Sequence, residues 1–198
     1  METLKNELKL KPNQFETLVN TLINFKESEE PETLEAIMAS DTGITPVIDD
    51  LLAVGLTMIV GDGYSGKSSF SYQLLEAVSN GAKFAGQFQT RKANTLIVQL
   101  DEPLANAKAK FRRMGFAPDT DCFRIKWHFH PLMIPKLVNW IVTYKLKVIV
   151  LDSLIKIAGG FTDICSAEFG LLIYRLNKIA SKYDVSIVLV HHLNRDPK

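Results

Sequence analysis

A strand–loop–helix pattern near residue 60 constrains the fold more than any other stretch of this 198-residue chain. Leu56–Val60 is a run of apolar and β-branched residues, which is typical of a buried strand. Gly61–Ser68 follows with the letters GDGYSGKS, which match the pattern GxxxxGK[ST]. In such a loop, glycines let the backbone N–H groups turn toward an anion, and the next helix adds its positive dipole end. The stretch therefore predicts a phosphate-binding loop and a nucleoside triphosphate site.

The loop residues have different expected roles. Lys67 is expected to reach the β- and γ-phosphates as an exposed cation that the fold does not need, and Ser68 to hold Mg²⁺ through its hydroxyl. The other residues expected around the phosphates are Gly61, Asp62, Gly63, Tyr64, Ser65, Gly66 and Ser69.

The bulk composition is that of an ordinary globular protein, with 46% hydrophobic and 23% charged residues. The net charge of +1 does not by itself argue for a nucleic-acid partner. Cys122 and Cys165 are too few for a disulfide framework, which favours reduced cysteines in the cytoplasm. The N-terminus is charged and has no apolar core, so it does not match a signal peptide. No apolar stretch approaches the length of a membrane span. We therefore expect a cytoplasmic protein with no membrane partner.

Apolar runs and helical periods alternate through the rest of the chain. Strands are predicted at residues 56–60, 95–100, 122–129, 147–151 and 185–190, and the helices between or before them end near residues 81, 114, 144 and 183. This alternation predicts a three-layer α/β domain with a mainly parallel sheet. Right-handed crossovers would bring the carboxyl ends of all strands to one edge, where such sheets bind ligands.

Residues 1–44 predict a small helical extension in front of a core at 45–198. A helical period begins at Pro12, and a second short helix carries Leu34, Ile37 and Met38. The apolar face of this extension could pack against the core or against a neighbouring subunit.

Acidic residues follow two of the predicted strands. Asp152 comes directly after VIVL and is expected to anchor the water shell of Mg²⁺ opposite Ser68, although a turn or helix N-cap is the alternative. Asp101 and Glu102 are candidates for the catalytic base, because they end the strand that we expect beside the loop strand. Glu102 is preferred for its longer reach, but the choice is nearly even. Both could instead form a turn before Pro103.

Histidines end the last predicted strand and also occur at the end of the third. His192 could sense the γ-phosphate, and His191 could equally be a core histidine. The pair does not suit a metal, since adjacent strand residues point to opposite faces. His128 and His130 share a face, but no third ligand is evident.

Two other segments each allow two interpretations. The basic run on one predicted helix is either a solvated face or a phosphate contact, and it comprises Lys108, Lys110, Arg112 and Arg113. The segment Ile155–Ile164, with its Gly-Gly pair and Phe161, is either a moving loop at the active edge or an inert connection.

The stretches GDGYSGKSS, LIVQLDEP, VIVLDS and VLVHHLNR occur in the order and spacing of the RecA-like ATPases. Over about residues 45–198 the chain resembles the hexameric replicative helicases of the plasmid RepA and DnaB type, and the related ATPase modules of primases. The segment GAKFAGQF and the long stretch from SAEFG to HHLNR add to this resemblance.

The resemblance implies ATP and Mg²⁺ as cofactors, with Lys67 and Ser68 on the phosphates and the metal and Asp152 as the second metal-side acid. The family's catalytic glutamate falls on Asp101, with Glu102 one place later. His192 matches the residue that reports the γ-phosphate. Arg195 matches the arginine of the helicases' QLNR stretch.

The resemblance also implies a hexameric ring and single-stranded DNA as a partner. Relatives continue past the last strand with a DNA-contacting loop and a cation that reaches the neighbour's site. This chain stops at Lys198, so we expect slow or no turnover by the chain alone.

Three hypotheses follow. The first is the ATP-hydrolysing module of a hexameric DNA helicase in DNA replication. The second is a RecA/KaiC-like regulatory ATPase whose nucleotide state switches a protein partner. The third, a small-molecule kinase, would need an arginine-rich lid that the sequence does not show.

Overall fold

The computed structural model describes residues 31–40, 46–116, 121–158 and 167–193. The chain divides into two compact units, Met1–Gly43 and Ile44–Lys198. In the first unit the described part contains helix α3 (Leu34–Ala39). Thr33 caps this helix, because its hydroxyl oxygen accepts a hydrogen bond from the N–H of Ala36. The apolar side chains of α3 are exposed, and the helix predicted from Pro12 lies outside the described residues.

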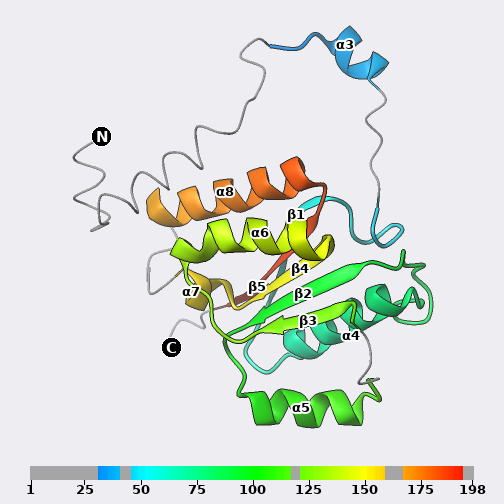
Figure 1. The fold of residues 1–198 in the computed structure, drawn as a ribbon, viewed down its shortest axis with the longest axis vertical. Helices are drawn as coiled ribbons and strands as arrows, with labels where there is room; N and C mark the ends of the chain where they lie inside the picture. The colour runs from blue at the N-terminus through cyan, green and yellow to red at the C-terminus, as the bar shows by residue number, and fades with distance from the viewer. Residues whose placement is uncertain (1–30, 41–45, 117–120, 159–166, 194–198) are drawn as a thin grey trace. The chain divides into compact units, whose positions relative to one another are not determined.

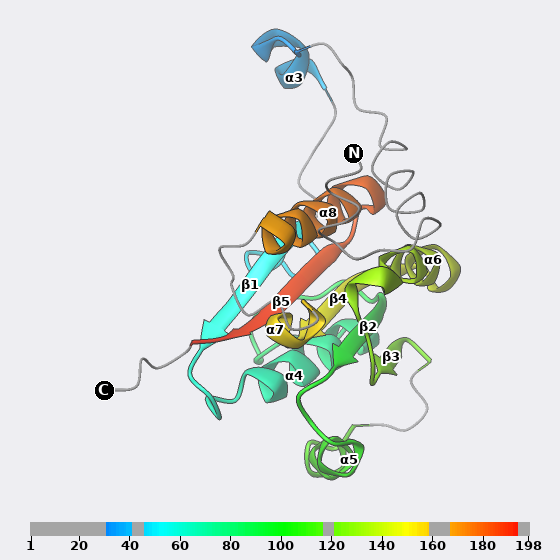
Figure 2. The ribbon, with the colours of Figure 1, turned by 90° about the vertical axis from the view of Figure 1, so that its left-hand side faces the viewer.

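The second unit is built on one parallel sheet of five strands. The strands are β1 (Gly55–Gly61), β2 (Asn94–Gln99), β3 (Phe123–Lys126), β4 (Leu146–Asp152) and β5 (Ser186–His192). Their order across the sheet is β1-β5-β4-β2-β3, so β4 is the central strand. Helices flank the sheet on both faces, as Figures 1 and 2 show from two directions. The predicted three-layer α/β fold with a parallel sheet is confirmed.

The helices connect successive strands. They are α4 (Lys67–Asn80), α5 (Leu104–Arg113), α6 (Ile134–Tyr144), α7 (Leu154–Ile157) and α8 (Ala167–Tyr183), with a short 3₁₀ turn at Pro131–Met133. Helices α6 and α8 lie over one face of the sheet and α4 lies under the other (Figures 1 and 2). Helix α4 ends where Gly81 takes a left-handed φ of 69°, which glycine adopts without steric cost.

Alternate residues of the central strands supply the cores on the two faces. Val148, Val150, Val188 and Val190 are buried in the cluster that includes Tyr72 of α4. Because both faces are covered, β2, β4 and β5 are nearly continuous apolar runs, as expected for a parallel sheet.

Three expectations about the core are wrong. Strand β2 does not lie beside the loop strand β1, because β5 and β4 stand between them. The third strand covers Phe123–Lys126 rather than residues 122–129, since it is an edge strand that pairs with β2 alone. Part of the segment expected to be a loop forms α7, whose Leu154 and Ile157 are buried.

The strand register brings the functional ends together. Gly61 of β1 pairs with His192 of β5, Asp152 of β4 with Val190, and Gln99 of β2 with Asp152. The carboxyl ends of four strands therefore meet at one edge. Within the described ranges, no helix has the length and apolar character needed to cross a membrane.

Candidate active site

The loop after β1 is a tight turn that opens directly into α4. Gly66, the N-cap residue of α4, has a left-handed φ of 86°, a conformation that favours glycine. A Cβ at Gly61 would lie 3.2 Å from the Ser65 Oγ, closer than side chains normally approach. Tyr64, with a φ of 59°, extends its ring fully into solvent. The glycines thus permit a compact loop at the amino end of a helix, where an anion is favoured.

Lys67 is folded into this loop and is only 7% exposed. Its Nζ donates hydrogen bonds to the carbonyl oxygens of Gly61 (2.9 Å) and Asp62, and to the Ser65 Oγ (3.2 Å). The expectation of an exposed cation is wrong, because the loop carbonyls take up the ammonium group. A phosphate bound here would compete with those carbonyls for the ammonium.

Asp152 is a fully buried carboxylate at the end of the central strand. Its Oδ2 accepts a hydrogen bond from Gln99 Nε2 (3.0 Å), whereas its Oδ1 has no partner among the described residues. Burial raises the pKa of Asp152, and the neighbouring groups of Ser68 and Gln99 act in the opposite direction. A buried carboxylate oxygen without a donor among the described residues has room for a partner such as a water molecule or an ion. Asp152 and Ser68 therefore fit a Mg²⁺ ion, a hard cation that prefers oxygen ligands.

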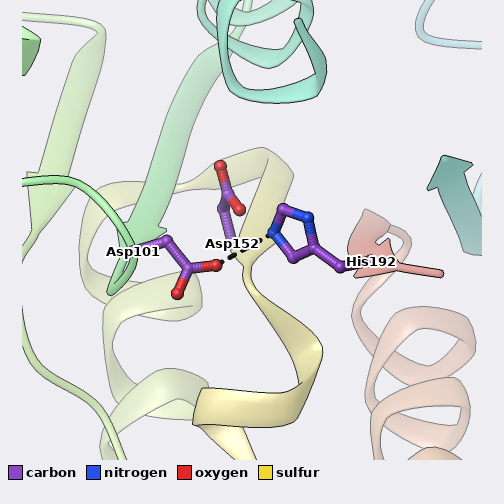
Figure 3. A group of neighbouring side chains, drawn as sticks. All are labelled: Asp101, Asp152 and His192. Carbon is purple, nitrogen blue, oxygen red and sulfur yellow. Dashed lines mark hydrogen bonds and ion pairs between the residues drawn. The ribbon is translucent and has the colours of Figure 1, made fainter. Parts of the chain in front are cut away.

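Asp101 and His192 complete a cluster with Asp152, and Figure 3 shows the three side chains converging. His192 Nε2 lies 3.1 Å from Asp101 Oδ2. One potential ligand atom from each of Asp101, Asp152 and His192 lies within 4.8 Å of the other two. The structure thus joins the ends of β2, β4 and β5, which are far apart in the sequence.

A lysine from α7 also contacts Asp101. Lys156 Nζ lies 2.8 Å from Asp101 Oδ1 and donates to the Leu100 carbonyl (3.1 Å). Burial alone would raise the pKa of Asp101, but hydrogen bonds from Lys156, Ser153 and His192 and the charge of Lys156 hold that pKa below its usual range. Asp101 is therefore ionised at neutral pH.

Glu102 has different surroundings. Tyr72 donates its hydroxyl proton to Glu102 Oε2 (2.9 Å), and Lys110 Nζ lies 2.6 Å from Oε1. Burial and the adjacent Glu102 raise the pKa of Tyr72, so the phenol remains a donor. Both carboxylate oxygens of Glu102 are thus engaged, and Glu102 is not part of the cluster with Asp152.

A cleft of about 830 Å³ opens beside these groups. Its walls include residues 63–69 of the loop, Asp101, Glu102, Lys110, Lys156 and His192. The volume falls within the range of small-molecule and cofactor pockets, roughly 300–1,000 Å³. The predicted convergence of the phosphate loop with the ends of β2, β4 and β5 is therefore present.

Several other predicted candidates lie apart from the cleft. Of the basic run, Lys110 alone is among its lining residues. Within the described ranges, His128 and His130 belong to no three-ligand group. His191 has a buried Nδ1 that finds no partner among the residues that the structure describes. Arg195, Phe161 and the Gly-Gly pair lie outside the described residues.

Sequence reasoning missed three residues that the structure places at the site: Gln99, Tyr72 and Lys156. Gln99 offered a signal, because it is a polar residue inside the apolar run LIVQL. Tyr72 offered none, since it matches an ordinary helical pattern. Lys156 lies in the segment Ile155–Ile164, which the sequence allows as a loop at the active edge, but nothing in the pattern singles out the lysine.

Comparison with protein families agrees with this geometry. A family model described as an AAA domain (AAA_25) matches residues 25–198. The chain belongs to this family. It is therefore a nucleotide-binding P-loop ATPase module, and its parallel sheet fits a RecA-like core. None of the curated proteins compared with the chain matches it.

The burial of Asp152 gives a prediction for the Asp152→Asn variant. The folded protein binds the Asp152 proton more tightly than the unfolded chain does, because the folded pKa is raised. The wild type therefore loses stability as the pH rises through that folded pKa. Without nucleotide and in EDTA, Asp152→Asn should melt at a higher temperature than the wild type at pH 7, and the difference should shrink toward pH 4.

Thermal denaturation followed by circular dichroism measures this difference. The matched control is Asp121→Asn, which neutralises an exposed carboxylate and should leave the melting temperature nearly unchanged at both pH values. An Asp152→Asn protein that melts below the wild type at pH 7 would contradict the prediction.

Proposed function

We propose that the cleft binds MgATP and hydrolyses it to ADP and phosphate. The observation that carries the proposal is the buried Oδ1 of Asp152, which lies beside the phosphate loop and has no partner in the described part of the chain. Backbone N–H groups of the loop and Lys67 would hold the phosphates, and Ser68 and Asp152 would hold Mg²⁺. When bound, the metal supplies positive charge that offsets the charge of the phosphates.

Asp101 is the better candidate for the residue that orients and deprotonates the attacking water. Its carboxylate contacts His192 and lies near Asp152, whereas both oxygens of Glu102 are held by Tyr72 and Lys110. The depressed pKa keeps Asp101 ionised but also makes it a weak base. This weakness supports slow turnover by the chain alone.

His192 would link the nucleotide to the last strand of the sheet. It contacts Asp101 and lies on β5, directly beside the β1 residue Gly61 that begins the loop. A change at the γ-phosphate would alter the Asp101–His192 contact and so act on the end of β5.

We further propose that this module works in a hexameric DNA helicase that moves along single-stranded DNA in replication. The support is the resemblance of the loop and strand-end motifs to the RepA and DnaB type. The alternative is a regulatory ATPase that switches a protein partner. The exposed apolar side chains of α3, Leu34, Ile37 and Met38, support that alternative because they offer a protein-binding face.

Removal of the loop lysine tests the nucleotide site. Lys67→Ala should lower affinity for ATP at least tenfold and abolish turnover, because the phosphates lose their main cation. The variant should also lose about 1–3 kcal/mol of stability, since the carbonyls of Gly61 and Asp62 lose a buried donor. Fluorescent-nucleotide titration and urea denaturation measure the two effects.

The control for this experiment is Lys83→Ala, which removes an exposed lysine outside the cleft. It should bind ATP like the wild type. If Lys67→Ala bound ATP normally, the proposed site would be wrong.

The choice of base has its own test. Asp101→Asn should reduce the single-turnover hydrolysis rate by roughly 10²–10⁴, the usual contribution of a positioned general base. Glu102→Gln should reduce the rate by less than about tenfold, because the Glu102 carboxylate contacts Tyr72 and Lys110 and would not contact the attacking water. Both rates are measured with protein in excess over ATP. The reverse order of effects would assign the role to Glu102.

Single-stranded DNA separates the two proposed roles. A helicase motor should hydrolyse ATP several-fold faster with DNA present, because DNA orders the nucleotide interfaces of the ring. A steady-state ATPase assay with and without an oligonucleotide, with Lys67→Ala as the blank, gives the answer. Turnover unaffected by DNA, with MgATP still bound, would favour the regulatory ATPase.

A further inference from the structure

Gln99 is a buried amide at the end of β2, and all of its polar capacity is used inside the site. The residue is 1% exposed. Its Nε2 donates to Asp152 Oδ2 (3.0 Å) and to the Tyr72 hydroxyl oxygen (2.9 Å). Its Oε1 accepts from the backbone N–H groups of Asp101 (2.9 Å) and Glu102 (3.2 Å). An amide has two donors and one oxygen with two lone pairs, so no capacity remains.

This arrangement fixes the orientation of the amide. If the oxygen and nitrogen exchanged places, the NH₂ group would face two backbone donors and the oxygen would face the Asp152 carboxylate. Both contacts would be repulsive. The Gln99 side chain is therefore a rigid connection.

The partners of Gln99 belong to the two halves of the proposed reaction centre. Asp152 is the metal-side acid on β4, and the N–H of Asp101 belongs to the segment that carries the proposed base. Gln99 pairs with Asp152 across the strands, so one short side chain spans both. By holding Oδ2 of Asp152, it leaves Oδ1 as the oxygen free for a cation.

We propose that Gln99 is a positioning residue that holds the Asp152 carboxylate and the Asp101 segment in one fixed arrangement. This inference rests on the proposed MgATP hydrolysis and adds to it the residue that aligns its two acidic groups. Gln99 does not touch nucleotide or metal. It acts through Asp152 and through the backbone of Asp101.

Loss of Gln99 should leave the phosphate loop intact and disturb only the metal-side acid and the base. Asp152 would be free to rotate, and the Asp101 segment would lose its buried acceptor. Residues that orient metal ligands in this way commonly contribute 10–100-fold to metal affinity or activity. The dependence of ATP binding on Mg²⁺ should therefore change, whereas binding without Mg²⁺ should not.

The test compares Gln99→Leu with Thr95→Val. Leucine has a similar volume and removes all four hydrogen bonds. Thr95 is also fully buried on β2, at the far end from the site, where its hydroxyl contacts the Ser79 Oγ (2.9 Å) and the Cys122 carbonyl oxygen (3.3 Å). Both variants lose buried hydrogen bonds on the same strand, so both should melt at a lower temperature. This pair separates a site effect from a general loss of stability.

Three quantities are measured for each protein: the Kd for a fluorescent ATP analogue in EDTA, the Mg²⁺ concentration that half-maximally tightens this binding, and the single-turnover hydrolysis rate. For Gln99→Leu we expect an unchanged Kd in EDTA, a half-maximal Mg²⁺ concentration raised about 10–100-fold, and a hydrolysis rate lowered by a similar factor. Thr95→Val should match the wild type in all three. If Gln99→Leu fails to fold, Gln99→Met, another apolar residue of similar volume, replaces it.

A Gln99→Leu protein with the Mg²⁺ requirement of Thr95→Val would overturn the inference and leave the proposed function standing. The proposed function fails separately if the wild type binds no ATP, or if Mg²⁺ does not affect binding by the wild type. Either result would also end the inference. A raised Mg²⁺ requirement confined to the Gln99 variant supports it.

Discussion

A carboxylate buried at the end of the central strand is the constraint on which the rest of this site depends. Asp152 has no contact with solvent, and a charge in such a place is costly unless donors or a cation surround it. The fold supplies a donor from β2 through Gln99 and a hydroxyl from the loop through Ser68. One oxygen remains without a partner among the described residues. The sheet edge is thus arranged around a buried carboxylate whose charge the proposed Mg²⁺ would balance.

Each lysine that lines the cleft contacts an acceptor of the protein itself. Lys67 is held by loop carbonyls, Lys156 by Asp101 and Lys110 by Glu102. Each cation has an acceptor within the protein, and each lies where a phosphate could replace that acceptor. Binding MgATP would therefore exchange internal contacts for contacts to the nucleotide. The net gain is smaller than the sum of the new contacts, because each lysine gives up an existing partner.

The sequence predicted the fold class and the loop because both depend on local patterns. A glycine-rich turn between an apolar strand and a helix carries its own geometry, and alternating strand and helix periods indicate a parallel sheet. The order of the strands does not follow from local patterns. The chain crosses from β1 to β2 and leaves between them the two positions that β4 and β5 occupy later. The burial of Lys67 could not be predicted from the sequence either, because only the folded loop brings the carbonyls of Gly61 and Asp62 around the ammonium group.

Asp101 and Glu102 show that side-chain length alone does not decide which of two neighbouring acids faces the proposed reaction centre. Glu102 has the longer side chain, but its length serves to meet Tyr72 of α4 and Lys110 of α5. The shorter Asp101 lies beside His192 and near Asp152. What separates the two neighbours is the direction in which the backbone presents them, and Gln99 holds that backbone through the N–H groups of both residues. A buried amide two residues before Asp101 and three before Glu102 thus ties the backbone of both acids to the end of β2.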